Sequence, residues 1–500
     1  RRSSTNFLYQ PVLLFATNPQ EECTRMKRSY TQSLALLLTA LGGSVHAANL
    51  VEVANAAWSY DGTWRAARMT WNADQQLLVQ GRAALFPNVS ASYGRYDNEQ
   101  EIEDLGLEQN YGSEVSTFTL TQPLFRVDAW YGYKEAKSST DIAQANFEQA
   151  RQDFVLRVAQ GYFGVLRAWD NWVSAKAEEK AIGRQLEQTQ ERFDVGLVPA
   201  TDVEEAQATY DLTQVNLIVA RQQYEIARDQ LETLTGQQWE TLSELQDDLP
   251  MDGPQPSAMN EWIDKAQSEN PGVRAALYNT QLTENTAKRQ LGTMMPQVQL
   301  VAQYQHSHLD PDDNTATTGG GAGSGGWLYD TQNRQIGIEV SMPLFQGGGL
   351  NSRRKEAYLR ADAADFQYDQ AVRDIIQQTR SAYRTVEADA LRIKAREQAI
   401  RSTRSALDAT QSGYEVGTRN VVDVLNAQRA LFAAERDYAN ARYDYIIDSL
   451  TLKSTTGDLQ QGDLAAVNQW LSPSETLNLY QPDLEGKSEE MMEENAANNE

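Results

Sequence analysis

The residues RFDVGLVPATDV, at positions 192–203, return in altered form as GYEVGTRNVVDV at positions 413–424. The two stretches are offset by 221 residues, and the same offset relates further identical pairs on both sides of them. These pairs are Asp153 and Asp374, Tyr162 and Tyr383, Gln207 and Gln428, Tyr224 and Tyr445, and Gly236 and Gly457. A period of this length is far beyond the roughly 20–50 residues of solenoid repeats. The sequence therefore predicts two copies of one large unit.

Long helices are expected on both sides of each repeated stretch. Residues from about 128 to 195 and from about 350 to 414 contain no proline and have a helical composition. At ~1.5 Å per residue, a helix of ~67 residues reaches ~100 Å. The return segments, about 202–235 and 422–456, carry large apolar or aromatic residues every seven positions, which indicates coiled-coil packing. These positions are Val203, Tyr210, Leu217, Tyr224 and Leu231, and then Val424, Leu431, Tyr438, Tyr445 and Leu452.

Segments with a period of two precede the long helices in each copy, and they predict four strands with one apolar face. Their polar tips span residues 97–112, which are acidic without Lys or Arg, and residues 309–331, which are rich in glycine. His306 and His308 fall on one of these strands, where we expect exposed strand residues rather than metal ligands. The apolar positions are Val89, Ala91, Tyr93, Phe118, Leu120, Val298, Leu300, Ala302, Tyr304, Ile336, Ile338, Val340 and Met342.

The amino-terminal region has the features of a secretory signal peptide. Met26-Lys27-Arg28 is a short basic head, residues 34–41 are apolar, and Val45-His46-Ala47 is a small-residue cleavage pattern. We expect cleavage after Ala47 and interpret residues 1–25 as an upstream extension outside the fold. Cys23 lies in that extension, so the expected mature chain has no cysteine and no disulfide.

Composition excludes several classes of protein. The chain has 500 residues, a formal net charge of −25 and a mean hydropathy of −0.58. Such polarity argues against a protein with several membrane-spanning helices, and the acidic balance argues against nucleic acid as a partner. Three histidines and one cysteine are too few for a zinc or thiolate site. There is no nucleotide motif or Ser-His-Asp set, so we expect neither an enzyme nor a cofactor, although composition alone leaves a carboxylate-pair hydrolase open.

Four apolar-faced strands on a secreted chain leave two alternatives. The strands form a small soluble sheet packed on helices, or several chains pool them in a closed barrel, because lipid does not tolerate an open sheet edge. Outer-membrane barrels carry aromatic girdles at both interfaces. The aromatic residues on or beside these strands favour the barrel; they are Phe86, Tyr93, Tyr96, Phe118, Tyr304, Trp327 and Phe345.

The chain resembles the TolC-type outer-membrane efflux proteins over roughly residues 49–470. The resemblance is carried by the two repeated stretches, by Pro-Leu-Phe at 123–125 and 343–345, and by Gln346-Gly347-Gly348-Gly349. It implies an α+β membrane protein with an internal duplication. Each of three identical chains gives four strands to one 12-stranded β-barrel. A long periplasmic α-helical barrel with a mixed α/β equatorial domain continues it.

The resemblance also implies a division of the chain into segments. Residues 1–25 are the extension, 26–47 the signal peptide, 48–85 helical barrel and equatorial domain, 86–124 the first β-barrel hairpin, 125–236 the first α-barrel hairpin, 237–293 equatorial domain, 294–344 the second β-barrel hairpin, 345–457 the second α-barrel hairpin, 458–475 equatorial domain, and 476–500 an acidic disordered tail. Within the equatorial part we expect a helix over 463–471 that contains Trp470.

The ends of the α-barrel hairpins carry the candidate functional residues. Gly196 and Gly417 are expected to end the long helices in a left-handed conformation, and Thr201 with Glu204 has capping-box spacing for the return helix. Simple helix capping is also the plain interpretation of Thr201 and Asp202. The resemblance implies instead that four residues close the periplasmic mouth by links between neighbouring hairpins: Thr201, Asp202, Tyr414 and Arg419.

The same resemblance implies a constriction ring and a docking tip. Asp423 would form a ring of carboxylates, which favours cations; one turn later the family pattern has a second Asp, where this chain has Asn426. Gly196, Leu197, Gly417 and Thr418 are the candidate docking residues for a periplasmic adaptor.

The function implied by the resemblance is a passive exit duct in the outer membrane of a Gram-negative bacterium. It serves tripartite multidrug efflux pumps and type I protein secretion, recruited by an adaptor and an inner-membrane transporter of the RND or ABC type. The alternative is a soluble periplasmic coiled-coil adaptor. An adaptor has one helical hairpin with compact β domains, whereas this chain has two hairpins and four alternating strands.

Overall fold

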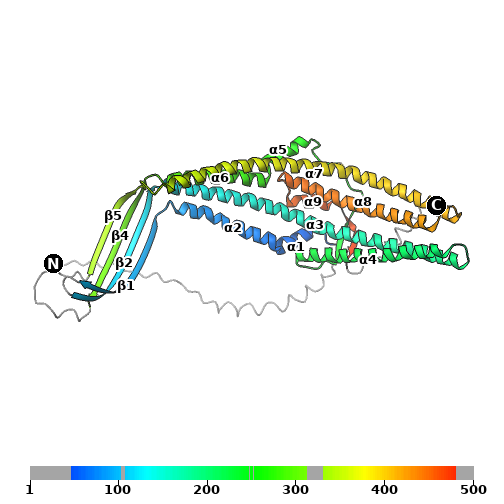
Figure 1. The fold of residues 1–500 in the computed structure, drawn as a ribbon, viewed down its shortest axis with the longest axis horizontal. Coiled ribbons are helices and arrows are strands. Elements are labelled where there is room, and N and C mark those ends of the chain that lie inside the picture. The colour runs from blue at the N-terminus through cyan, green and yellow to red at the C-terminus, as the bar shows by residue number, and fades with distance from the viewer. Residues whose placement is uncertain (1–46, 103–106, 247, 252, 312–329, 480–500) are drawn as a thin grey trace, which may run out of the picture. The chain divides into compact units, whose positions relative to one another are not determined.

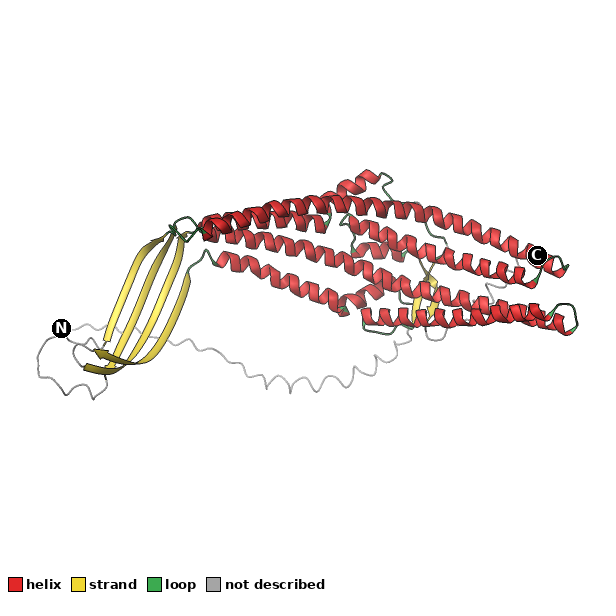
Figure 2. Cartoon of the chain, in the orientation of Figure 1, coloured by secondary structure: helices red, strands yellow, loops and turns green. Residues whose placement is uncertain are grey.

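The computed structural model describes residues 47–479, apart from 103–106, 247, 252 and 312–329. The expected extension, nearly all of the signal peptide and most of the acidic tail therefore lie outside the described residues. Residues 48–479 belong to one compact unit (Figures 1 and 2).

The duplication predicted from the repeated stretches is confirmed, because the same order of elements occurs twice. The first copy comprises α2 (Gly62–Ala83), β1 (Asn88–Ile102), β2 (Leu107–Phe125), α3 (Val127–Asp194) and α4 (Ala200–Thr235). The second comprises α6 (Pro271–Gly292), β4 (Gln297–Pro311), β5 (Asp330–Ser341), α7 (Gly349–Glu415) and α8 (Val421–Thr455). The remaining elements are α1 (Leu50–Tyr60), β3 (Thr241–Leu245), α5 (Met259–Glu269), α9 (Gln461–Asn468) and β6 (Leu471–Asn478).

The four predicted strands form one antiparallel sheet in the order β1-β2-β4-β5. Residues that pair across all four strands form a row whose side chains share a face of the sheet. Apolar rows alternate with polar rows along the strands. One row is Val89, Leu120, Ala302 and Ile336, and the next row, on the opposite face, is Ser90, Thr119, Gln303 and Gln335. The apolar face is not covered by the chain itself, since Ile336 is 76% exposed. His306 lies on this sheet with its ring against the Asp330 carboxylate.

The long helices form two antiparallel pairs. α3 has 68 residues and pairs with α4, and α7 has 67 residues and pairs with α8. No proline interrupts either long helix, and both end at a glycine with positive φ. The two turns lie at the same end of the unit, away from the strands (Figure 1). α2 packs along α3, and α6 packs along α3 and α7. α6 therefore extends the helical layer, although it lies in the predicted equatorial segment 237–293.

Segments before, between and after the two copies build a small domain beside the middle of the helices (Figure 1). β3 pairs with β6 at the carboxyl end of the described chain, a pairing that the sequence did not suggest. The core of this small domain is shared with α3. There the buried Tyr162 hydroxyl donates to the Ser243 carbonyl oxygen at 2.7 Å. The helix expected over 463–471 instead ends at Asn468, and Trp470 lies in the turn before β6. β6 also reaches into the segment that we assigned to the tail.

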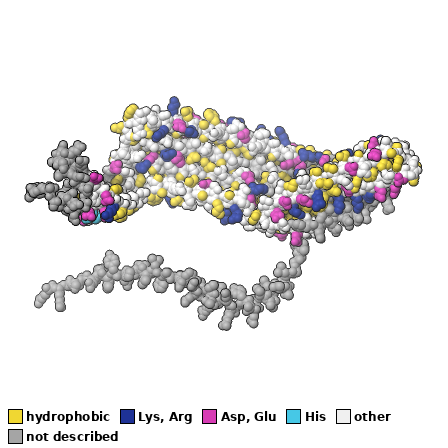
Figure 3. All heavy atoms as spheres, turned by 60° about the horizontal axis from the view of Figure 1, so that its bottom comes forward, with side chains coloured by type: hydrophobic (Ala, Val, Ile, Leu, Met, Phe, Trp, Pro, Cys, Tyr) yellow, Lys and Arg dark blue, Asp and Glu magenta, His cyan; other side chains and the backbone are white. Residues whose placement is uncertain are grey.

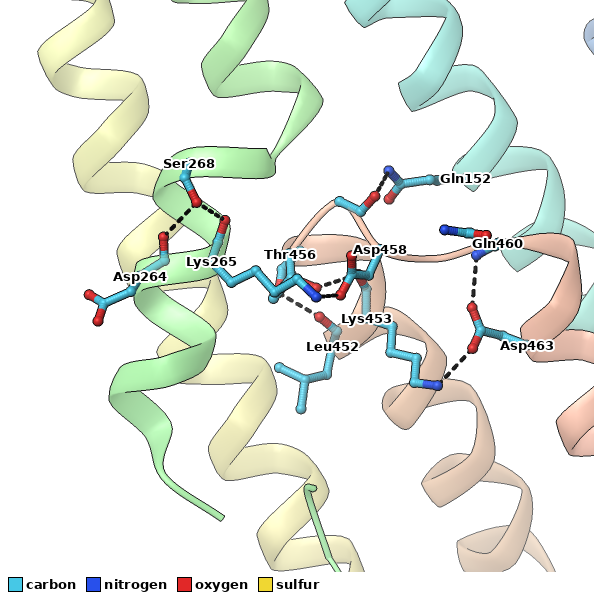
Figure 4. Close-up of polar contacts among 12 residues, drawn as sticks. Gln152, Asp264, Lys265, Ser268, Leu452, Lys453, Thr456, Asp458, Gln460 and Asp463 are labelled. Carbon is cyan, nitrogen blue, oxygen red and sulfur yellow. Dashed lines mark hydrogen bonds and ion pairs between the residues drawn. The ribbon is translucent and has the colours of Figure 1, made fainter. Parts of the chain in front are cut away.

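Polar contacts join the end of α8 and the loop after it to three other elements (Figure 4). Gln152 of α3 donates to the carbonyl oxygen of Gly457 at 2.9 Å, and Lys265 of α5 forms an ion pair with Asp458. Lys453 of α8 lies 2.7 Å from the Asp463 carboxylate at the start of α9. These contacts fix the equatorial segments to the long helices.

Candidate functional site

The two long helical pairs end in turns with the same backbone geometry. Gly196 and Gly417 both have φ of +78°, as the sequence predicted. The Leu197 amide donates to the Arg192 carbonyl oxygen at 2.8 Å, and the Thr418 amide donates to the Gly413 carbonyl oxygen at 2.8 Å. This bond pattern is the Schellman motif, in which a left-handed residue ends the helix and its last carbonyl groups are satisfied.

The return helices begin differently from each other. The capping box expected for Thr201 and Glu204 is wrong, because α4 begins at Ala200 and its cap residue is Pro199. Thr201 therefore lies inside the first turn, and Asp202 donates its amide to the Pro199 carbonyl oxygen at 3.1 Å. In the second copy Asn420 caps α8, and its Oδ1 accepts from the Asp423 amide at 2.8 Å.

Asp423, the expected constriction residue, has two local partners. Its carboxylate accepts from the Asn420 amide in the capping box, and Arg419 Nη1 lies 3.7 Å from Asp423 Oδ2. Both side chains of that ion pair are substantially exposed, so it contributes little to stability. Asn426 is exposed nearly one turn further along α8. Asp423 therefore remains accessible for a role at the mouth of a channel.

Tyr414 is the buried member of the predicted gate residues. Its side chain packs in a cluster with Ile182 of α3, Ala206 of α4 and Val424 of α8, and the residue is only 7% exposed. Its hydroxyl oxygen is buried and has no hydrogen-bond partner among the described residues. A buried polar group without a partner costs free energy, so such groups call for an explanation.

The structure does not join the four predicted gate residues to one another within one chain. Among the residues that are described, no side-chain hydrogen bond or ion pair connects Thr201 or Asp202 with Tyr414 or Arg419. Tyr414 instead lies against Arg192, whose guanidinium carbon is 4.5 Å from the centre of the tyrosine ring. Sequence reasoning missed Arg192, although one signal was present: Arg192-Phe193 aligns with Gly413-Tyr414, so the repeat differs at this point.

A second polar cluster, also missed, lies between α7 and α8. Asp389 of α7 is buried near Asp448 of α8, and neither of its carboxylate oxygens has a hydrogen-bond partner among the described residues. Burial and the neighbouring Asp448 raise the pKa of Asp389 to about 6. Arg392 Nη1 lies 3.0 Å from the Asp389 carboxylate, and Asp444, which is paired with Arg167 of α3, completes the charged surroundings.

Metal sites and membrane-spanning helices are two further features that bear on function. The described part of the chain contains no group of three or more His, Cys, Asp or Glu side chains placed to hold a metal ion. Among the same residues, no helix is both long enough and apolar enough to cross a membrane.

The duplicated fold, the amphipathic sheet and the paired turns define a class of protein. A sequence model of the family described as outer membrane efflux protein matches residues 61–237 and 262–458. The chain belongs to this family.

Individual relatives agree with the family. The chain is 32% identical over 468 residues to the outer membrane protein TolC of Escherichia coli K12, covering 91% of each protein. It is 28% identical to the alkaline protease secretion protein AprF of Pseudomonas aeruginosa, covering 88% of this chain and 91% of AprF. Among solved structures, the outer membrane protein VceC of Vibrio cholerae superposes with a TM-score of 0.67 at 19% identity, covering 82% of this chain and 96% of VceC.

The comparisons confirm the fold class and the general function that the sequence predicted. The protein is a TolC-type exit duct of the outer membrane, and its helices extend into the periplasm. The alternative of a soluble adaptor is wrong, because the relatives are outer-membrane channels and secretion proteins.

Proposed function

We propose that three copies of the chain assemble into one channel, closed at its periplasmic end by side-chain links between helical hairpins. The four-stranded sheet supports the assembly, because β1 and β5 each leave one edge unpaired within the chain. An open edge is not tolerated in lipid, and three copies joined edge to edge give a closed barrel of twelve strands.

The apolar face of the sheet has the dimensions of a lipid-facing band. On β5 and just beyond it, this face runs from Met342 to Arg334, where the first charged side chain appears. Eight residues at ~3.3 Å each give ~26 Å along the strand. That length is of the order of the ~25 Å apolar band of outer-membrane barrels, before strand tilt is considered.

The helices also carry apolar surface that one chain leaves uncovered. Large apolar side chains of α4 are exposed at Leu212, Val215 and Ile218, each three residues after the one before. Apolar side chains reach the surface along much of the helical part in Figure 3. Apolar contacts with a neighbouring copy would remove this surface from water.

The observation that carries the proposed gate is the buried hydroxyl of Tyr414. It lacks a hydrogen-bond partner among the described residues of its own chain, while Thr201, Asp202 and Arg419 lie at the same end with exposed or half-exposed side chains. A carboxylate from a neighbouring hairpin, such as Asp202, would satisfy the hydroxyl, and Arg419 would pair with Thr201 or Asp202. These links hold the mouth shut until a partner separates the hairpins.

Asp423 and the exposed turns complete the proposed site. Three copies of Asp423 form a carboxylate ring that binds cations at the mouth. Gly196 and Leu197 on one turn, with Gly417 and Thr418 on the other, provide the docking tip for a periplasmic adaptor. The cargo passes on to the duct from an inner-membrane transporter of the RND or ABC type. The chain itself catalyses no reaction.

Single-channel recording in planar bilayers tests the gate. The double variant Tyr414→Phe with Arg419→Ser removes the hydroxyl and the guanidinium, and we expect the closed-state conductance to rise several-fold. Tyr358→Phe, at a tyrosine of α7 far from the turns, serves as the matched control. A double variant that keeps the small conductance of the unaltered trimer would refute the gate links, and a monomeric species in native mass spectrometry would refute the assembly.

A further inference from the structure

The contact between Arg192 and Tyr414 joins the two hairpins of one chain. Arg192 is in the last turn of α3 and Tyr414 is in the last turn of α7. The guanidinium carbon lies 4.5 Å from the ring centre, well within the ~6 Å range of a cation–π interaction. Such an interaction strengthens when it is removed from water, and Tyr414 is buried.

The side chain of Arg192 contacts the Tyr414 ring through its guanidinium group. In the part of the chain that is described, no carboxylate forms an ion pair with Arg192. Its carbonyl oxygen accepts from the Leu197 amide, so the backbone that carries it is fixed by the same Schellman turn. A fixed backbone and a stacked guanidinium together define where the Tyr414 ring can lie.

The difference between the two copies explains why only the first can supply an arginine here. The counterpart of Arg192 is Gly413, and a Cβ atom built at Gly413 would lie 2.8 Å from Arg419 Cγ and 3.2 Å from Thr418 Oγ1. A side chain at position 413 would therefore displace Arg419, one of the proposed gate residues. The glycine lets Arg419 lie across the end of α7, and the arginine is placed on the other hairpin.

We propose that Arg192 is a positioning residue of the gate, which holds the Tyr414 ring of the second hairpin against the first hairpin of the same chain. This inference rests on the gate proposed above. Loss of the guanidinium frees the ring to turn, so the links to the neighbouring hairpin are made less often and the closed mouth leaks.

A pair of substitutions at one position separates charge from packing. Arg192→Met keeps a long unbranched side chain without the charge, and Arg192→Lys keeps a cation that can still lie over the ring. In planar bilayers we expect Arg192→Met to raise the closed-state conductance several-fold and Arg192→Lys to stay within twofold of the unaltered channel. Tyr414→Leu should match Arg192→Met, and combining the two should add little, because both remove one contact.

The outcomes distinguish this inference from the gate itself. If Arg192→Met keeps the small conductance while Tyr414→Phe with Arg419→Ser leaks, the positioning role is refuted and the gate stands. If Arg192→Lys leaks as much as Arg192→Met, the charge is not what holds the ring, and the inference is also refuted. If none of the variants leaks, the proposed gate fails. Arg192→Gln replaces Arg192→Met if the latter does not assemble, as judged by native mass spectrometry.

Discussion

The carboxyl pair between α7 and α8 makes a pH-dependent contribution to the stability of the second helical pair. Burial in the first place, and then the neighbouring Asp448 carboxyl group, raise the pKa of Asp389 from 3.8 to about 6. The folded state therefore binds more protons than the unfolded state between about pH 4 and 6, and stability falls as pH rises through that range. Integrated over the range, the loss from this one group is ~3 kcal/mol.

Asp448→Asn should remove part of that loss, because burial of Asp389, the larger cause of the raised pKa, is unchanged. An asparagine amide can donate to an ionised Asp389, and the repulsion between two carboxylates disappears. Because Asp448 is only half-buried, water screens part of the repulsion, and we expect the variant to be more stable than the unaltered protein by ~1–2 kcal/mol at pH 7.5. Near pH 4, where Asp389 is protonated, the difference should vanish.

Hydrogen exchange of α7 peptides around Asp389, measured on the assembled protein at pH 5 and pH 7.5 after correction for intrinsic rates, provides the assay. Asp365→Asn, at an exposed carboxylate on the same helix, is the matched control and should leave local protection unchanged. The charged groups around the pair are Arg392, Asp444 and Arg167, and none is altered. Equal protection of Asp448→Asn and the unaltered protein at pH 7.5 would refute the destabilising effect of Asp448 on the ionised Asp389.

Two further predictions concern the channel mouth and the equatorial loop. Asn426→Asp adds three carboxylates to the proposed Asp423 ring, so block by divalent cations in planar bilayers should become several-fold tighter; unchanged block would exclude position 426 from the constriction. Gly457→Ala should lower the melting temperature by several degrees, because Gly457 has φ of +83° and a Cβ atom would lie 2.6 Å from the Glu269 carbonyl oxygen. Gly462→Ala, in α9 with open space around it, is the control, and an equal effect of both would contradict the reasoning.

The features that local sequence determines were predicted well. Gly196 and Gly417 were correctly predicted to end their helices, because a residue in the left-handed conformation completes the turn. The alternation of apolar and polar residues correctly predicted which side chains share a face of the sheet. The pairing of β3 with β6 was missed because it joins segments more than 200 residues apart, with no pattern in either short strand. The capping of α4 was mispredicted because Pro199 takes the cap position two residues before Thr201.

The polar clusters could not be read from sequence for a related reason. Asp389 and Asp448 meet only because α7 and α8 pack with one particular rotation about their axes, and an aspartate on a long polar helix is ordinarily solvated. Arg192 meets Tyr414 only because the two turns, 221 residues apart, lie side by side. Such contacts depend on helix packing rather than on spacing along one helix.

The two copies keep the same backbone and divide the side-chain chemistry between them. In the proposed trimer, the equal turns at Gly196 and Gly417 would let both hairpins take equivalent places in a ring of six, since their main chains end alike. Equal side chains would crowd the mouth, because an arginine at position 413 would collide with Arg419. The second copy therefore carries Tyr414, Arg419 and Asp423, and the first carries Arg192 and Asp202. In the proposed mouth of alternating unlike hairpins, the arginine of one hairpin lies over the tyrosine ring of the next, a contact that six identical hairpins with Gly413 and Tyr414 could not make.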